Sequence, residues 1–150
     1  MWRVILAGVT CAAWLAAASP ATACSCARNP TAAGILSSAT AVFTGTVAAT
    51  ETVGNNVSVT TFRITEAFKG PAAGSTVKVR HRSGSSASCG VKFTPGESYT
   101  LAAYRSENEG AMLSANLCST WMFMPQVGLS KGLIESMRKL RKQPEQRPQQ

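Results

Sequence analysis

The sequence predicts a mainly β fold, with five strands joined by turns, a short helix before them and a longer helix after them. Two observations predict it. Segments rich in Val, Thr, Phe and Tyr recur at short intervals, and turns containing Gly, Asn or Pro separate them. Five is the strand count of an OB-type barrel, but the pattern by itself does not distinguish a barrel from a sandwich.

The first 23 residues have the organisation of a secretory signal peptide. Arg3 supplies a positive charge, residues 4–18 are apolar, and residues 21–23 (Ala-Thr-Ala) form a small-residue cleavage site. The apolar run is too short for a normal membrane span, and no other run approaches that length. We therefore expect cleavage before Cys24, secretion to an extracellular or periplasmic compartment, and no membrane span.

Removing 23 of the 150 residues leaves 127, enough for one domain with its own core. We expect this domain to cover residues 24–142 and to be a monomer. Residues 143–150 are rich in Pro, Gln and charge, so we expect a disordered tail there. Cys11 would leave with the signal peptide.

The remaining cysteines form an even set of the kind that pairs in an oxidising compartment. They are Cys24, Cys26, Cys89 and Cys118. A bond between the first two would close a strained ring, so we expect each of them to pair with one of the later two, in either arrangement. The N-terminus would then be tied twice to the body of the domain.

The strands are predicted from period and composition at residues 41–52, 57–67, 76–80, 99–104 and 112–118. Turn signals stand at residues 54–56, 68–71, 95–96 and 108–110. Gly45 indicates a bulge or bend in the first strand. Alternation in the second strand points Phe62 and Ile64 to the core.

The helices are predicted from their caps. Thr31 caps a short helix that ends at two serines, residues 37–38. Ser130 caps a second helix that runs to about Lys142. Its apolar face consists of Leu133, Ile134, Met137 and Leu140. We expect this face to dock on the barrel and the basic residues to be solvated, with a role at a membrane surface or on nucleic acid as the alternative.

Several segments of the mature chain follow one another in a recognisable order. They are Cys24-Ser25-Cys26-Ala27, Thr65-Glu66-Ala67-Phe68-Lys69-Gly70, Ser88-Cys89-Gly90, Tyr99-Thr100-Leu101-Ala102-Ala103 and Leu117-Cys118. In this order and spacing they resemble the N-terminal inhibitory domain of the tissue inhibitors of metalloproteinases, within the netrin-like group of OB-fold domains. The resemblance implies a five-stranded OB-type (netrin-like) barrel. It also implies disulfides between Cys24 and Cys89 and between Cys26 and Cys118.

The same resemblance implies inhibition of a zinc metalloendopeptidase. The α-amine and carbonyl oxygen of Cys24 would chelate the zinc of the target protease, and Ser25 would enter the pocket for the substrate side chain that follows the scissile bond. The implied inhibitory contacts are Cys24, Ser25, Cys26, Ser86, Ala87 and Ser88. Catalytic zinc leaves a coordination position open, which suits this chelation. The family's third disulfide and its C-terminal domain have no counterpart here.

Composition favours acidic partners and argues against catalysis. Arg3 leaves with the signal peptide, so fourteen of the fifteen Lys and Arg residues remain against seven Glu and no Asp, a balance of +7. The one histidine, His81, is expected to be exposed at a strand end between Arg80 and Arg82. No nucleophile–base or paired-carboxylate arrangement can be assembled. We therefore expect no enzyme activity, no cofactor and no intrinsic metal site.

Three other interpretations stay open. Cys24 and Cys26 could attach the N-terminus to the domain through disulfides without chelating a metal. Cys24 could be acylated as in a lipoprotein, although the preceding residues lack the usual Leu. The chain could also be a non-inhibitory netrin-like or OB-fold module that binds a partner protein or, weakly, an anionic polymer or oligonucleotide. The basic residues for that role would be Lys78, Arg80, Arg82, Lys92 and those of the last helix.

Overall fold

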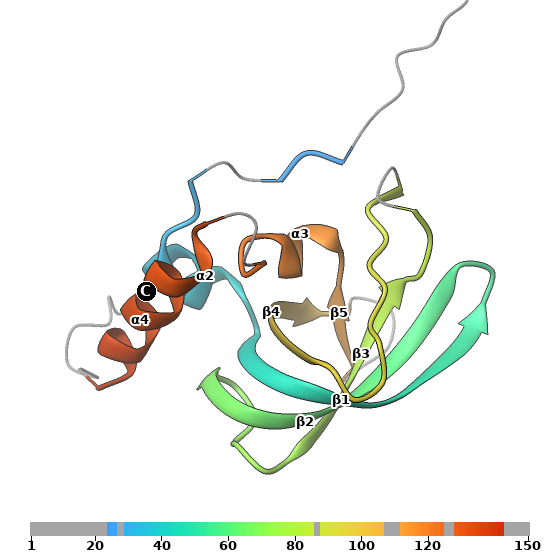
Figure 1. Cartoon of the computed structure of the whole chain (residues 1–150), viewed down its shortest axis with the longest axis horizontal. Coiled ribbons are helices and arrows are strands. Elements are labelled where there is room, and N and C mark those ends of the chain that lie inside the picture. Colours follow the sequence, from blue (N-terminus) through green and yellow to red (C-terminus); the bar gives the residue numbers. More distant parts are fainter. Residues whose placement is uncertain (1–23, 27–28, 86–87, 107–111, 125–127, 143–150) are drawn as a thin grey trace, which may run out of the picture.

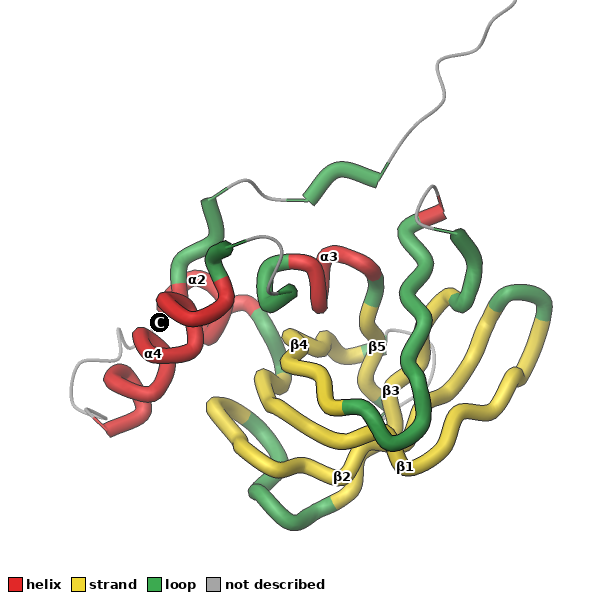
Figure 2. Tube along the Cα trace, viewed as in Figure 1, coloured by secondary structure: helices red, strands yellow, loops and turns green. Residues whose placement is uncertain are grey.

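A computed structural model describes residues 24–26, 29–85, 88–106, 112–124 and 128–142. The elements are α2 (Ala32–Ser38), β1 (Ala41–Gly54), β2 (Val57–Lys69), β3 (Thr76–Arg82), β4 (Ser98–Arg105), β5 (Leu113–Ala115), α3 (Leu117–Trp121) and α4 (Ser130–Lys142). The strands close into a barrel in the order β1-β2-β3-β5-β4. The predicted mainly β, five-stranded barrel with a helix on either side of the strands is confirmed (Figures 1 and 2).

The barrel closes because β1 pairs with both β2 and β4. All pairs are antiparallel except β3 with β5, which is parallel. The pairing of β1 with β2 shifts register next to Gly45, as its sequence position predicted. A Cβ on this glycine would lie 3.0 Å from the Arg63 carbonyl oxygen, so the backbones approach closely there.

Alternate residues of the strands fill the barrel. Phe62 and Ile64 are fully buried, as predicted. The Phe62 ring packs edge-to-face against Phe43 and Phe93, with centroids 5.8 and 5.0 Å apart. Ser58 and Thr60 also point inward, so part of the β2 inner face is polar. This polar part lies where β2 pairs with the end of β3.

A second apolar cluster lies outside the barrel, between its wall and the helices α2 and α4. Met137 and Leu133 of α4 are buried there against residues such as Ile35 of α2, and the predicted apolar face of α4 is the face that packs. Arg138, next to Met137 in the sequence, donates two hydrogen bonds, 2.8 and 2.7 Å long, to the Glu66 carboxylate. The helix is therefore held by apolar contacts and by a bidentate ion pair.

Every strand differs from its predicted range at one or both ends, and two of these differences have a visible cause. β2 continues to Lys69 and ends at Gly70, whose positive φ of 89° stops the strand. β5 covers only Leu113–Ala115, and the chain then turns into α3 instead of extending to residue 118. Asn116 causes this turn, because its side chain accepts from the Ser119 backbone N–H while the Ser119 hydroxyl accepts from the Asn116 N–H.

Candidate functional site

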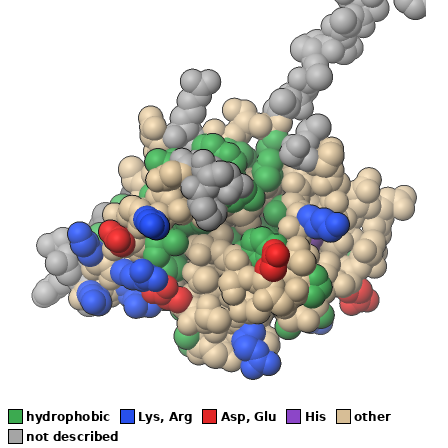
Figure 3. All heavy atoms as spheres, in the orientation of Figure 1, with side chains coloured by type: hydrophobic (Ala, Val, Ile, Leu, Met, Phe, Trp, Pro, Cys, Tyr) green, Lys and Arg blue, Asp and Glu red, His purple; other side chains and the backbone are tan. Residues whose placement is uncertain are grey.

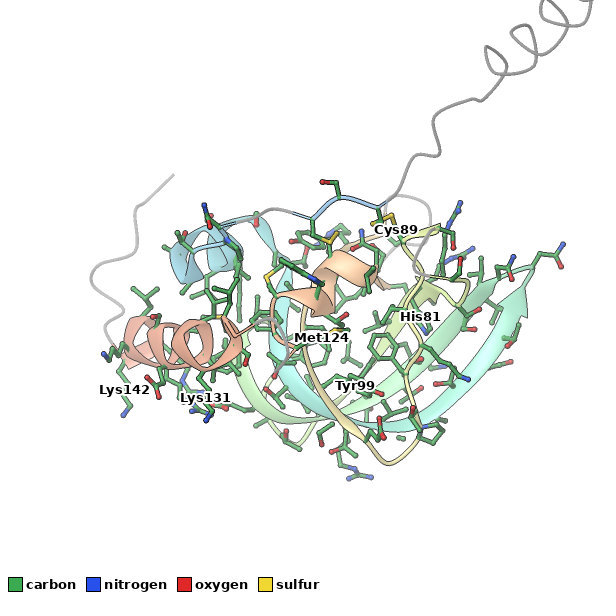
Figure 4. The ribbon with its side chains drawn as sticks, turned by 45° about the horizontal axis from the view of Figure 1, so that its top comes forward. His81, Cys89, Tyr99, Met124, Lys131 and Lys142 are labelled. Carbon is green, nitrogen blue, oxygen red and sulfur yellow. A yellow bond between two sulfur atoms is a disulfide. The ribbon has the colours of Figure 1, made fainter. Side chains whose placement is uncertain are left out.

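The segment Cys24-Ser25-Cys26 crosses one end of the molecule, along the edge formed by α3 and the loop after β3 (Figures 1 and 4). Cys24 forms a disulfide with Cys89, and Cys26 forms one with Cys118. These are the two pairs that the family resemblance implies. They close sequence separations of 65 and 92 residues, and structural disulfides of this kind fit an oxidising compartment.

The two disulfides lie side by side, with the Sγ atoms of Cys24 and Cys118 only 3.8 Å apart. Cys24 and Cys26 are half-buried, whereas Ser25 between them is exposed. Three of the sulfur atoms lie within 4.8 Å of one another. Because these sulfurs are oxidised, they offer no thiolate to a metal ion. The arrangement fixes the backbone on both sides of Ser25 and leaves the Ser25 side chain in solvent.

Glycines and backbone hydrogen bonds shape the loop that carries Cys89. The Ser85 carbonyl accepts from the Ser88 N–H at 3.0 Å and from the Gly90 N–H at 3.2 Å. A Cβ on Gly90 would lie 2.4 Å from the Gly84 carbonyl oxygen, so a larger residue does not fit. Cys89 itself has a φ of 56°, an uncommon conformation for a non-glycine residue that the surrounding bonds hold.

This loop, α3 and the N-terminal segment form one connected unit. The Cys89 carbonyl accepts from the Leu117 N–H at 2.9 Å, which joins the loop to α3 next to Cys118. Among the inhibitory contacts predicted in this loop, Ser88 is exposed. It lies next to Cys89, to which Cys24 is bonded. Ser86 and Ala87 lie outside the described residues, as do the predicted signal peptide and tail.

The prediction that His81 is exposed is wrong. Only 3% of its surface is accessible, and its ring packs edge-to-face on Phe93. Nε2 lies 2.8 Å from the Thr60 hydroxyl and Nδ1 lies 3.0 Å from the Val91 carbonyl oxygen. Burial lowers the pKa of His81, against the opposing effect of carbonyl oxygens that include that of Val91. The neutral ring thus receives a hydrogen bond from Thr60 and donates one to Val91.

His81 connects the barrel interior to the irregular segment that follows the Cys89 loop, through its contact with Val91. Figure 4 places it below Cys89 in that view, on the same side of the molecule. The neighbouring arginines suggested exposure, but the alternation of β3 puts residue 81 on the same inward face as Val79. The period of the strand was the signal that could have identified the burial.

The basic residues divide between different surfaces. Lys78 and Arg82 are exposed on the outer face of β3, and Lys92 is exposed beyond the Cys89 loop. Figure 3 shows another group of Lys and Arg side chains over α4. Within that group, Arg138 is bound to Glu66, and its hydrogen bonds lower the pKa of that carboxyl group.

A hollow of about 590 Å³ is lined by residues of the Cys89 loop, β3 and β5. Its lining includes Arg80 and Arg82, which were named as candidate anion-binding residues. It also includes Tyr104 and Ser114, which the sequence did not single out. No helix in the described part of the chain combines the length and the apolar character needed to traverse a lipid bilayer.

No protein-family model matches the chain, and no curated protein matches it either. The likeness to the metalloproteinase inhibitors therefore rests on the residues quoted above.

Proposed function

We propose that the protein is a secreted inhibitor of a zinc metalloendopeptidase. In this proposal the signal peptide is removed, and the new N-terminal Cys24 chelates the zinc of the target through its α-amine and its carbonyl oxygen. The observation that supports it is the double attachment of Cys24-Ser25-Cys26, by disulfides whose sulfurs approach to 3.8 Å, at an exposed edge.

The chemistry of the chelate follows from the ligands. An amine nitrogen and the carbonyl oxygen of the same residue close a five-membered ring around a metal ion. Catalytic zinc is bound by three protein ligands and holds a displaceable water in the fourth position. Since only the neutral amine binds, and α-amines in peptides have a pKa of about 8, inhibition should weaken as the pH falls below that range.

Rigidity would supply much of the affinity. A chain terminus is ordinarily mobile, and ordering it on a partner costs free energy. Here the half-buried Cys24 and Cys26 are bonded to two different elements, so little further ordering is required. The exposed Ser25 would enter the pocket for the side chain after the scissile bond, and its small size would select the proteases that fit.

The proposal is tested with the chain recovered after export. Its N-terminal sequence should begin at Cys24, and its intact mass should show two disulfides and no acyl group. It should inhibit at least one member of a panel of zinc endopeptidases. Chemical acetylation of the α-amine should abolish that inhibition, while the same chain with acetylated lysines and a free α-amine should retain it. Equal inhibition by the two forms would exclude chelation, and an acylated Cys24 would identify a lipoprotein instead.

A further inference from the structure

The two disulfides of the N-terminal segment lie close enough for their sulfur atoms to exchange partners. The Sγ atom of Cys24, bonded to Cys89, lies 3.8 Å from the Sγ atom of Cys118, which is bonded to Cys26. The Sγ atoms of Cys24, Cys26 and Cys118 all lie within 4.8 Å of one another. A thiolate freed at Cys24 or Cys118 therefore begins in contact with a sulfur of the other disulfide.

Exchange across this contact has one outcome, whichever bond is reduced first. When the Cys24–Cys89 bond is reduced, the Cys24 thiolate attacks Cys118, the Cys24–Cys118 bond forms, and Cys26 leaves as a thiolate that takes a proton from water. When the Cys26–Cys118 bond is reduced, the Cys118 thiolate attacks Cys24, the same bond forms, and Cys89 leaves. A bond between Cys24 and Cys26 is disfavoured because it closes a strained ring. Both routes leave Cys26 and Cys89 as free thiols.

Chain entropy and local backbone geometry permit this transfer. The new bond closes a sequence separation of 94 residues, close to the larger of the two present separations, 65 and 92, so the cost in chain entropy is similar. Cys89 has a φ of 56°, and its backbone can leave this uncommon conformation once its sulfur is free. All four cysteines are half-buried, which leaves them within reach of a small thiol.

We propose that the two disulfides form a redox switch, in which a dithiol reductant converts the chain to a form with one bond, between Cys24 and Cys118. One thiolate of the reductant attacks a native disulfide and its second thiolate resolves the mixed disulfide, so the chain gains two electrons and the reductant becomes a disulfide. Exchange across the 3.8 Å contact then needs no further electrons. In the product Ser25 is no longer fixed on both sides. The expected loss of inhibition rests on the proposed function, whereas the exchange itself does not.

The first test uses the oxidised, exported chain and needs no protease. Dithiothreitol is added at one equivalent and the reaction is quenched with acid. Free thiols are labelled with N-ethylmaleimide and located by fragmentation mass spectrometry. Cys26 and Cys89 should carry the label together. Reduction without exchange would instead label Cys24 with Cys89, or Cys26 with Cys118, and this pattern would overturn the proposal.

Single-cysteine variants test the contact without a reductant. Cys26→Ser allows a form with the Cys24–Cys89 bond and a free Cys118 thiol, which is isolated at low pH. After return to about pH 8, where thiolate is present, the label should become divided between Cys118 and Cys89. Cys118→Ser is the matched control, because its free Cys26 could reach Cys24 only through the strained ring, so the label should stay on Cys26. A label confined to Cys118 in the first variant would show that the contact does not support exchange.

The last test addresses inhibition. The double variant Cys26→Ser with Cys89→Ser holds the product bond alone, and its inhibition constant should be at least about tenfold higher than that of the oxidised chain, because the N-terminal segment must be ordered on binding. The exchanged chain, blocked with iodoacetamide, gives the same comparison where the variant does not fold. Equal constants would show that the exchange does not control inhibition. An oxidised chain that inhibits no protease contradicts the proposed function instead, and the labelling pattern still decides the exchange.

Discussion

The two ends of the described chain are attached to the barrel in different ways. The N-terminal segment is held by two disulfides, and Ser25 between them remains exposed. The C-terminal helix α4 is held by a buried apolar face and an ion pair to Glu66. Covalent attachment fixes a backbone while burying little of it, whereas apolar attachment requires burial. Only the first arrangement leaves backbone atoms available to a partner.

The largest effect is expected from the N-terminal attachment. Cys26→Ser together with Cys118→Ser removes a bond between residues 92 positions apart. The loop-entropy model predicts a loss of about 4 kcal/mol in the free energy of unfolding. Urea denaturation measures it, and protease inhibition should be lost along with stability because Cys24 would then be held on one side only. A loss below about 1 kcal/mol would show that the bond does not fix this segment.

Weakening the attachment of α4 should lower the stability of the protein and leave inhibition unchanged. Met137 is fully buried in the outer cluster, so Met137→Ala should cost about 3 kcal/mol in the free energy of unfolding. Ser136→Ala, at an exposed position of the same helix, is the matched control and should be nearly neutral. At a temperature where the variant is still folded, inhibition should be unchanged. A selective loss of inhibition would mean that α4 belongs to the inhibitory surface.

The barrel should lose stability in mild acid because His81 is buried in it. Burial lowers the pKa of His81, so the unfolded chain binds this proton more readily than the folded chain. Stability is therefore full above the ordinary pKa of about 6.5 and declines as the pH falls below it, until the folded-state pKa is passed, by at most about 1.4 kcal/mol per pH unit. Urea denaturation between pH 8 and pH 5 measures the decline. A His81→Asn variant with the same decline would contradict this assignment.

The ion pair between Glu66 and Arg138 should lose its contribution to stability at a lower pH than His81 does, and the loss should be smaller. Hydrogen bonds from Arg138 lower the pKa of Glu66, so the contribution of this pair is present above the ordinary carboxyl pKa of about 4.3 and is lost as the pH falls through the folded-state value. Because Arg138 is largely exposed, Glu66→Gln should cost only about 0.5–1 kcal/mol at pH 7. The difference from wild type should vanish near pH 2. A constant difference at all pH values would indicate a packing effect instead.

Local patterns predicted what depends on local structure. The alternation of β2 identified Phe62 and Ile64, and the helical period identified the buried face of α4. Pairing in the barrel is not local, so the sequence did not show that Arg80, Ser114 and Tyr104 would share a row. That row exists because β5 lies parallel to β3 and between it and β4.

Two predictions were wrong although the sequence contained the information needed to correct them. Asn116, which forms a capping pair with Ser119, was included in a strand that was predicted too long. His81 was assigned to the surface because of its charged neighbours, whereas the period of β3 placed it with the buried Val79.

The most direct measurement examines the metal itself. A zinc endopeptidase that the chain inhibits is prepared with cobalt in place of zinc, and its visible absorption is recorded with the exported chain and with a variant carrying one extra alanine before Cys24. Chelation by the α-amine and carbonyl oxygen predicts a changed cobalt spectrum with the native terminus and an unchanged one with the extended terminus, at equal stability of the two chains. Inhibition that persists with no change in the cobalt spectrum would contradict the account.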